Sequence, residues 1–268
     1  MIHPGLGFIP QDASPEEIFA HVERMMRQGD WMQKAGEPLL SRFIDFPSLA
    51  NKKVLDIGYG VGWLLNEYVR AGSEVHGIDL SHSHYAYSNY RFRNYANVCL
   101  QVASADSIPY TDNFFDFISA YGVIHHAGDD QQCFSEIYRV LKPSGKVFLM
   151  LYRRGGPKYW WRKVLRRGIL GGGLRRSGYE FTKFLYSVTD AYGKDSPGAP
   201  ISRHYSRAQL EELFVNFGSV DIKIFGNRHE WDYLPAHKFP LTSWLLPRGV
   251  RDRLVTLSGA YWIVNLSK

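Results

Sequence analysis

A regular alternation of strand-like and helix-like segments over residues 53–151 constrains the fold of this 268-residue chain more than any other feature. Val54-Leu55-Asp56-Ile57 is a short apolar strand that runs into a glycine-rich turn, and Trp63–Arg70 carries apolar residues at helical spacing. The same rhythm continues to a strand at Lys146–Leu151, after the turn Pro143-Ser144-Gly145. Parallel neighbouring strands need crossover connections, so the alternation predicts an α/β protein with helices on both faces of a parallel sheet.

The remaining elements of this pattern are predicted from apolar runs and capping residues. Further strands are expected at Glu74–Asp79, Cys99–Ala103, Phe114–Ala120, Val220–Phe225 and Tyr261–Leu266. Three helices should begin after Ser81, Asp129 and Ser206, which are N-capping residue types, and run to about Tyr95, Leu141 and Phe217.

Four segments describe the organisation of the chain. Residues 1–50 form an N-terminal helical segment, with a capping box at Ser14-Pro15-Glu16-Glu17 that opens a helix toward Gln28, and a second helix at Glu37–Phe46. Residues 51–151 form the core, and 152–204 a basic and aromatic insertion that is expected to act as a substrate lid. Residues 205–268 complete the sheet and contain a second insertion at 226–259.

The composition favours one cellular compartment, the cytoplasm, and argues against disulfide-rich and membrane-spanning proteins. The two cysteines, Cys99 and Cys133, have no paired spacing, which excludes a disulfide framework or a cysteine zinc site; no metal site is expected. The sequence after Met1 lacks a cationic and apolar leader, and no apolar run reaches the roughly 20 residues that cross a bilayer. We therefore expect a soluble cytoplasmic protein, whose oligomeric state the sequence leaves open.

The glycine-rich turn Asp56-Ile57-Gly58-Tyr59-Gly60-Val61-Gly62 suits several ligands, and its neighbours discriminate among them. A carboxylate at Asp56 would repel a pyrophosphate, whereas it can favour the ammonium and sulfonium end of S-adenosylmethionine. Trp63 occupies the position of the third glycine of a dinucleotide fingerprint, where it would obstruct close packing of helix and strand. The turn therefore favours S-adenosylmethionine over a dinucleotide.

Two more acidic residues follow the next two strands. Asp79 ends the second strand, where a carboxylate can accept both hydroxyls of an adenosine ribose. Asp106 follows the third strand and could accept from an adenine amino group, while the Ser107 N–H offers a donor to the ring. A single aspartate at a strand end is more often a cap or turn former than a ligand. Three of them at the carboxyl ends of consecutive strands lie where α/β sheets bind ligands.

With these residues in place, the chain resembles the class I S-adenosylmethionine-dependent methyltransferases, in particular the ubiquinone/menaquinone-type and small-molecule subgroup. The resemblance covers about residues 50–151 and lies in Val54–Gly62, Gly77–Ser81, Asp106–Tyr110, Phe114–Asp116, Gly122–His126 and Arg139–Gly145. One position departs from the family pattern: Ser144 stands where a second glycine is usual.

The resemblance implies a Rossmann-like seven-stranded sheet whose last strand is antiparallel. It also implies that the glycine turn contacts the methionine end of the cofactor, that Asp79 contacts the ribose, and that Asp106 and Ser107 contact the adenine. The cofactor-binding residues expected are Asp56, Gly58, Gly60, Gly62, Asp79, Leu80, Asp106, Ser107 and Tyr121.

Candidates for a general base follow the fourth strand. Transfer to an oxygen or a protonated nitrogen needs a base, and His125 and His126 lie near the expected methyl group. The alternative is that one histidine packs structurally. Further candidates are Tyr121, Tyr152, Asp190, His204 and Tyr205.

The net charge of +6 is concentrated in one block. No Asp or Glu occurs from Ile137 to Tyr179. Nine basic residues of this gap lie in 153–176, and without them the chain is slightly acidic: Arg153, Arg154, Lys158, Arg162, Lys163, Arg166, Arg167, Arg175 and Arg176. Residues 153–176 are a solvated amphipathic helix, a lid for an anionic substrate, or a membrane-surface helix, since Tyr159-Trp160-Trp161 and Ile169-Leu170 accompany the arginines. No known nucleic-acid-binding module accompanies the charge, which argues against a nucleic-acid partner.

The functional hypothesis is an S-adenosylmethionine-dependent methyltransferase that acts on an oxygen or nitrogen of a small biosynthetic intermediate, for which an anionic group is one option. A cofactor-binding subunit without catalysis is the non-enzymatic alternative. An NAD(P)-dependent oxidoreductase is disfavoured by Asp56 and Trp63.

Overall fold

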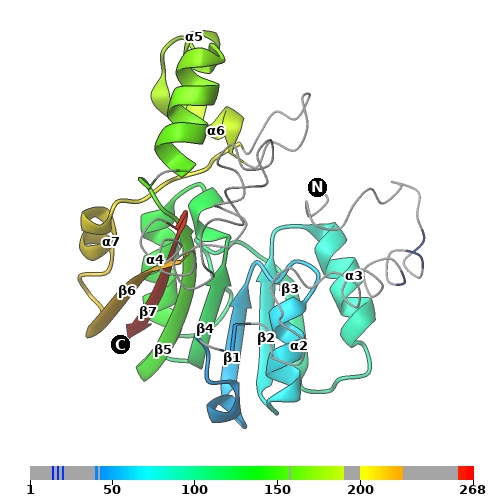
Figure 1. Ribbon diagram of the computed structural model, residues 1–268. Coiled ribbons are helices and arrows are strands. Elements are labelled where there is room, and N and C mark those ends of the chain that lie inside the picture. Colours follow the sequence, from blue (N-terminus) through cyan, green and yellow to red (C-terminus); the bar gives the residue numbers. More distant parts are fainter. Residues whose placement is uncertain are drawn as a thin grey trace, which may run out of the picture. The chain divides into compact units, whose positions relative to one another are not determined.

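The computed structural model describes Ser14, Glu17, Ala20 and residues 40–41, 43–156, 158–189, 200–225 and 259–268 (Figure 1). The chain divides into two compact units. Unit 1 comprises Met1–Tyr121, Gln131–Phe148 and Ser267–Lys268, and unit 2 comprises Gly122–Asp130 and Leu149–Leu266. The glycine-rich turn therefore belongs to unit 1, and the basic insertion belongs to unit 2.

Strands and helices alternate along the chain through the first five strands, as the sequence predicts, except that β4 follows β3 without a helix between them. In chain order the elements are η1 (Phe46–Leu49), β1 (Lys53–Ile57), α2 (Trp63–Arg70), β2 (Glu74–Asp79), α3 (His82–Phe92), β3 (Val98–Val102), β4 (Phe115–Tyr121), η2 (Ile124–His126), α4 (Asp130–Val140), β5 (Leu141–Tyr152), η3 (Lys158–Leu170), α5 (Gly173–Arg176), α6 (Phe181–Val188), α7 (Arg207–Leu213), β6 (Ser219–Phe225) and β7 (Tyr261–Ser267).

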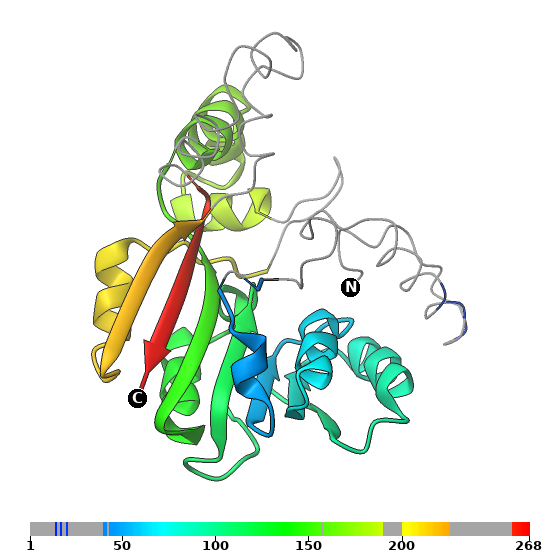
Figure 2. The ribbon, with the colours of Figure 1, turned by 60° about the horizontal axis from the view of Figure 1, so that its bottom comes forward.

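The strands form one seven-stranded sheet in the order β3-β2-β1-β4-β5-β7-β6. β1 pairs in parallel with both β2 and β4, and β2 pairs in parallel with β3 (Figure 1). β7 runs antiparallel to β5, because Lys268 N–H donates to the Gly145 carbonyl near the start of β5, and Arg153 N–H, just past its end, donates to the Ala260 carbonyl. Figure 2 shows β7 in red beside β6 in orange. The predicted seven-stranded sheet with an antiparallel last strand is confirmed.

The interior strand β1 is buried because its apolar side chains are covered on both faces. Val54 and Leu55 are fully buried, as expected for a strand inside a parallel sheet. In the neighbouring strand, a Cβ at Gly77 would lie 2.6 Å from Cδ1 of Tyr59. Gly77 therefore lets the Tyr59 ring of the glycine turn pack directly on β2.

Capping side chains open several helices as the sequence predicts. Ser81 Oγ accepts from the His84 N–H at the start of α3. Ser206 and Gln209 form the predicted reciprocal capping box of α7. The same reciprocal bonds join Ser14 and Glu17; the rest of the helix expected toward Gln28 lies outside the described residues.

The predicted helix Glu37–Phe46 is wrong in its described part. Leu40 has a φ of 60° and accepts hydrogen bonds from Phe43 N–H and Ile44 N–H, which makes an isolated turn. The 3₁₀ helix η1 follows, with Pro47 in its first turn. Positive φ at a branched residue interrupts an α-helix, so the chain enters β1 through a turn.

Three other boundaries differ from the predictions. β5 begins at Leu141 rather than Lys146, because Ser144 N–H donates to the Lys268 carbonyl and the predicted turn is drawn into the sheet. α7 ends at Leu213, four residues short of the predicted end, and α3 ends at Phe92.

The basic insertion, in which the sequence predicted no strand and left a helix at 153–176 among its alternatives, contains η3, α5 and α6 (Figure 1). Most of the second insertion, 226–259, lies outside the described residues. Within the described part of the chain, no helix is long and apolar enough to cross a membrane.

Candidate functional site

The glycine turn between β1 and α2 needs glycine for its backbone conformation. Gly58, Gly60 and Gly62 have φ values of 70°, 54° and 77°, in the left-handed region that favours glycine. Gly58 N–H donates to the Ile78 carbonyl at 2.7 Å, which fixes the turn to the end of β2. A Cβ at Gly60 would meet no heavy atom within 4 Å. The turn is thus fixed to β2 through Gly58, and the space beside the Cα atom of Gly60 is open.

Helix α3 supports the same turn from the other side. Ser88 Oγ donates to the Gly60 carbonyl at 3.0 Å, and Arg91 Nη1 donates to the Val61 carbonyl at 2.8 Å. A Cβ at Gly62 would lie 2.6 Å from the Phe92 ring. These contacts occupy carbonyl oxygens of the turn, while the N–H groups of its three glycines donate to Ile78, Asp79 and Tyr59, so hydrogen bonds fix the turn through both kinds of backbone group.

Asp79 lies at the carboxyl end of β2, where the sequence places it, and joins the glycine turn to α3. Its Oδ2 accepts from Gly60 N–H at 2.9 Å, and its Oδ1 accepts from Ser81 N–H at 2.8 Å. His84 Nδ1 lies 3.2 Å from both carboxylate oxygens. Burial acts to raise the pKa of Asp79, but the hydrogen bonds and charge of these neighbours outweigh it and lower the pKa. Asp79 is therefore an ionised carboxylate.

Asp56 is a buried carboxylate at the end of β1. Ser119 Oγ on β4 donates to Asp56 Oδ1 at 2.7 Å, and Ser119 and Asp56 are register partners. Burial raises the pKa of Asp56 to about 7, against the lowering effect of the Ser119 hydrogen bond and with help from the Asp79 charge. Among the described residues no cation pairs with Asp56. A buried, uncompensated carboxylate is suited to a cationic ligand.

The third predicted acid, Asp106, lies half-buried in the loop after β3. The Ser107 N–H, which was expected to face an adenine ring, donates to the Ser104 carbonyl at 3.2 Å. An adenine ring nitrogen would have to share this N–H with the turn. Leu80, which follows Asp79, is 68% exposed, so it can cover a ligand held by Asp79.

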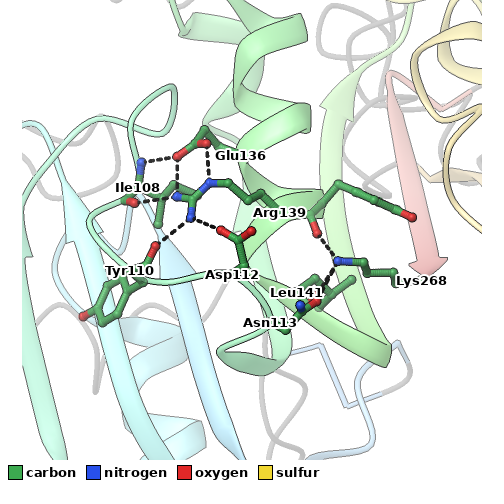
Figure 3. Close-up of polar contacts among 9 residues, drawn as sticks. Ile108, Tyr110, Asp112, Asn113, Glu136, Arg139, Leu141 and Lys268 are labelled. Atoms are coloured by element: carbon green, nitrogen blue, oxygen red, sulfur yellow. Dashed lines mark hydrogen bonds and ion pairs between the residues drawn. The ribbon is translucent and has the colours of Figure 1, made fainter.

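An ion-pair cluster centred on Arg139 of α4 fixes the loop that carries Asp106 (Figure 3). Its guanidinium donates to both carboxylate oxygens of Glu136 at 2.7 and 2.8 Å. It also donates to the Ile108 and Tyr110 carbonyls at 3.0 and 2.8 Å and to Asp112 at 2.8 Å. Glu136 in turn accepts from Ile108 N–H at 2.8 Å. Such bidentate, charge-assisted contacts hold both backbone polar groups of Ile108 in place.

Tyr121 ends β4, and its ring stacks on Phe148 with ring centroids 6.4 Å apart and planes 9° apart. Burial raises the pKa of the Tyr121 hydroxyl. The hydroxyl therefore stays protonated at neutral pH, which makes Tyr121 a poor general base and a suitable hydrogen-bond donor.

The two candidate catalytic histidines belong to unit 2, and they differ in burial. His125 is fully buried and stacks on Tyr152 with ring centroids 3.7 Å apart. Neither of its ring nitrogens has a hydrogen-bond partner. Burial and the positive field of His126, His204 and Lys163 hold its pKa well below the ordinary value. His125 is therefore a neutral packing histidine in this unit.

His126 is only partly buried, and a hydrogen bond to a backbone carbonyl orients its ring. Nδ1 lies 2.6 Å from the Ile201 carbonyl, and a carbonyl can only accept. Nδ1 therefore carries the proton, which leaves Nε2 as the basic nitrogen of the neutral ring. This tautomer is the one that a general base requires.

A polar cluster within unit 2 surrounds Tyr152. Lys163 Nζ donates to Thr189 Oγ1 at 2.8 Å and to His204 Nε2 at 2.7 Å, while His204 Nδ1 lies 3.2 Å from the Ser202 carbonyl. The Tyr152 ring lies 5.4 Å from the His204 ring and 5.6 Å from Lys163 Nζ. These contacts make the cluster electrostatically positive.

The remaining base candidates differ in position. The Tyr205 hydroxyl donates to Asp130 Oδ2 at 2.7 Å, which identifies it as a buried structural tyrosine. Asp190 lies outside the described residues. In the described part of the chain, no group of three or more His, Cys, Asp or Glu side chains is arranged to hold a metal ion.

Sequence reasoning missed three residues of this site: Ser119, His84 and Arg139. Ser119 and His84 each touch a predicted acid, from another strand or from the following helix. Arg139 lies in the motif Arg139–Gly145 on which the family resemblance rests, so its presence was visible although its loop contacts were not.

Comparison with known proteins bears on this arrangement. A family model described as "Methyltransferase domain" matches residues 55–149. Demethylmenaquinone methyltransferase of Geobacillus sp. (strain WCH70) is 30% identical over 232 residues, which cover 78% of this chain and 88% of that enzyme. Phosphoethanolamine N-methyltransferase 2 of Caenorhabditis elegans is 34% identical over 120 residues, 44% of this chain and 27% of the much longer relative.

A solved structure shows the same fold. The Haemonchus contortus phosphoethanolamine N-methyltransferase 2, in complex with phosphomonomethylethanolamine and S-adenosylhomocysteine, matches with a TM-score of 0.52 and 21% identity, over 81% of this chain and 48% of that one. The strand order, the acid-flanked glycine turn and these relatives agree on one conclusion. The chain belongs to the class I S-adenosylmethionine-dependent methyltransferases, with S-adenosylmethionine as its cofactor.

Proposed function

We propose that this protein transfers a methyl group from S-adenosylmethionine to an oxygen or nitrogen atom of a small biosynthetic intermediate that carries an anionic group, in the cytoplasm. The observation that carries the cofactor part is Asp56, a buried carboxylate without a cationic partner in the described structure, directly before three glycines of positive φ. S-adenosylmethionine has an ammonium and a sulfonium at one end, which match this carboxylate.

In this proposal, different residues of unit 1 bind different parts of the cofactor. Asp56 and the glycine turn hold the methionine end, Asp79 accepts from the ribose hydroxyls, and Asp106 accepts from the adenine amino group. His84 Nδ1 lies 3.2 Å from both oxygens of Asp79, the two atoms to which the hydroxyls of a diol would donate. A ribose would therefore share Asp79 with His84 or displace it.

Once bound, S-adenosylmethionine supplies an electrophilic methyl group. The chain then has to orient the acceptor and remove its proton. His126 is the proposed base, since Nδ1–H donation to Ile201 leaves Nε2 able to take the proton of a hydroxyl or ammonium. His125 and Tyr152 act as packing that fixes the His126 ring, with His125 4.2 Å and Tyr152 5.6 Å from it between ring centroids.

The positive cluster of Lys163 and His204 supports an anionic acceptor. Its field lowers the pKa of His125, and the insertion that contributes Lys163 contains no acidic residue before Glu180. The relatives reported above are named for a demethylmenaquinone and for phosphoethanolamine, so phosphorylated amines and demethylated quinols are the first acceptors to test.

Neither alternative function gains support. An oxidoreductase would need a dinucleotide beside Asp56 and Trp63, which both oppose. A subunit without catalysis would retain the cofactor site yet give no turnover on any acceptor. Release of S-adenosylhomocysteine in the presence of phosphoethanolamine or a demethylated quinol, and its absence without acceptor, would support the proposed enzyme; cofactor binding without turnover across both classes would support the subunit.

Replacement of the proposed base should separate catalysis from cofactor binding. His126→Ala should lower turnover about 10²–10⁴-fold, the contribution of a general base, and leave S-adenosylhomocysteine affinity unchanged by calorimetry. His125→Asn should instead lower thermal stability, because it disturbs the stack on Tyr152. Full activity of His126→Ala would remove His126 from this role.

Cofactor affinity should depend on pH through Asp56. Its pKa is about 7 without a bound cation, and only the ionised form attracts the cofactor. Affinity for S-adenosylmethionine should therefore rise by up to about tenfold per unit between pH 5.5 and 6.5 and level off above pH 7. Asp56→Asn should bind weakly with a flat profile; the same slope in that variant would assign the titration to another group.

The Arg139 cluster should control the adenine end of the cofactor. Arg139→Ala releases the loop that carries Asp106 and should weaken S-adenosylhomocysteine binding by about 5–30-fold, the scale of one or two charge-assisted hydrogen bonds. The preference for S-adenosylhomocysteine over S-inosylhomocysteine, which lacks the adenine amino group, should fall as well. Arg70→Ala, which removes an exposed partner of Glu67, is the control and should change neither; an unchanged preference in Arg139→Ala would contradict the loop assignment.

A further inference from the structure

The basic insertion of unit 2 has its own small core. Helices η3, α5 and α6 pack around Phe184, which is fully buried together with Tyr159 and Leu185. A Cβ at Gly168 would lie 2.9 Å from the Phe184 ring, and one at Gly173 would lie 2.8 Å from it. These glycines let the three helices approach closely, so the insertion is a packed helical element and not an extended loop (Figure 1).

Two tight turns of this element present apolar side chains to solvent. Ile169 and Leu170, at the end of η3, are 59% and 74% exposed, and Tyr179, after α5, is 75% exposed. The turns are fixed by backbone bonds from Gly172 N–H to the Ile169 carbonyl and from Tyr179 N–H to the Leu174 carbonyl. Trp160 and Trp161, near the start of η3, are also about half exposed.

Arginines accompany these apolar side chains, and the one neighbouring carboxylate in this stretch of the sequence is Glu180, which follows Tyr179. Arg166, Arg175 and Arg176 are exposed, and the sequence holds no Asp or Glu from Ile137 to Tyr179. We call the surface made by Ile169, Leu170, Tyr179, Arg166, Arg175 and Arg176 the arginine tip.

We propose that the arginine tip docks on the surface of an anionic lipid bilayer. Aliphatic side chains exposed beside arginines fit the boundary between headgroups and acyl chains, where apolar groups are buried while guanidinium groups stay at phosphate level. Tryptophan and tyrosine are the aromatic residues enriched at this boundary, which places Trp160, Trp161 and Tyr179 in the expected class.

Other partners fit the same surface less well. A nucleic acid would use the arginines and could stack on Tyr179, but it would leave the exposed aliphatic side chains of Ile169 and Leu170 unused. A second copy of this chain would bring the same positive charge against itself. A solvated helix face would not expose two adjacent aliphatic side chains to this extent. The bilayer uses both the charge and the apolar side chains.

Docking of this kind is reversible and salt-sensitive, because a few apolar side chains bind only marginally without anionic lipid. The test is co-sedimentation of the full chain with vesicles of phosphatidylcholine alone or with 30% phosphatidylglycerol. Binding should appear with phosphatidylglycerol and fall as salt rises. Arg175→Glu/Arg176→Glu should weaken it by at least about 25-fold, since each arginine contributes roughly fivefold, and Leu170→Ser by about tenfold.

Matched controls separate location from overall charge and hydrophobicity. Arg93→Glu/Lys146→Glu makes the same change in net charge at exposed residues elsewhere, and Val215→Ser removes a side chain that is 76% exposed, like Leu170; both should bind vesicles as the wild type does. Calorimetry with S-adenosylhomocysteine checks folding of each variant, and Tyr179→Ser, on the other turn, provides a second apolar test.

Several outcomes would overturn the proposal. The first is no vesicle binding at low salt, and the second is binding that the tip variants leave intact. The third is a change in solution mass on Leu170→Ser without vesicle binding, which would identify the tip as a contact between two copies. Retention on RNA without retention on vesicles, lost in Arg175→Glu/Arg176→Glu, would identify a nucleic-acid surface instead.

Discussion

The Asp79 carboxylate is the interaction on which the rest of unit 1 depends. It accepts from Gly60 N–H in the turn after β1 and from Ser81 N–H at the start of α3, and so joins two strand-to-helix connections through one side chain. The backbone of the glycine turn has positive φ at three positions, a conformation that local preferences alone would not hold. Asp79 supplies the tertiary contact that holds it, while its position at the carboxyl end of β2 directs the same carboxylate toward the ligand edge of the sheet.

Asp56 and the ion pair of Arg139 with Glu136 are the residues proposed to act at the two ends of the cofactor. Asp56 contributes a buried carboxylate that accepts a hydrogen bond from the Ser119 hydroxyl and has no cationic partner among the described residues, so a bound cation would stabilise its ionised form. Arg139 and Glu136 hold the loop after β3 through the backbone of Ile108. Each part of the cofactor would therefore be bound in a different way. The methionine end would lie at the uncompensated charge of Asp56, the ribose at the Asp79 carboxylate that also holds the turn, and the adenine at the loop that Arg139 fixes.

The sequence predicted the sheet and most of its helices because the local signals agree with the tertiary structure. Apolar runs mark the strands, and Ser81 and Ser206 cap helices as their side chains predict. The number and bounds of the helices in 152–204 were not predicted, because α5 and α6 begin without side-chain caps and because Gly168 and Gly173 are needed for packing on Phe184 rather than for turns. The early start of β5 was missed because it depends on pairing with Lys268, over a hundred residues away.

Within the candidate site, the acids were visible and their partners were not. Asp56, Asp79 and Asp106 follow from their positions at strand ends, whereas Ser119 lies 63 residues from Asp56 along the chain. The distinction between His125 and His126 also required the structure, since adjacent histidines in a motif look alike until one is buried on Tyr152 and the other is oriented by the Ile201 carbonyl.

The most direct measurement of the central claim is a calorimetric titration of the wild type and Asp79→Ala with S-adenosylhomocysteine and with NAD. The account predicts one S-adenosylhomocysteine per chain for the wild type, no binding of NAD, and an affinity lower by about 1.5–3 kcal/mol for Asp79→Ala. Binding of NAD by the wild type, or unchanged S-adenosylhomocysteine affinity in a folded Asp79→Ala variant, would contradict it.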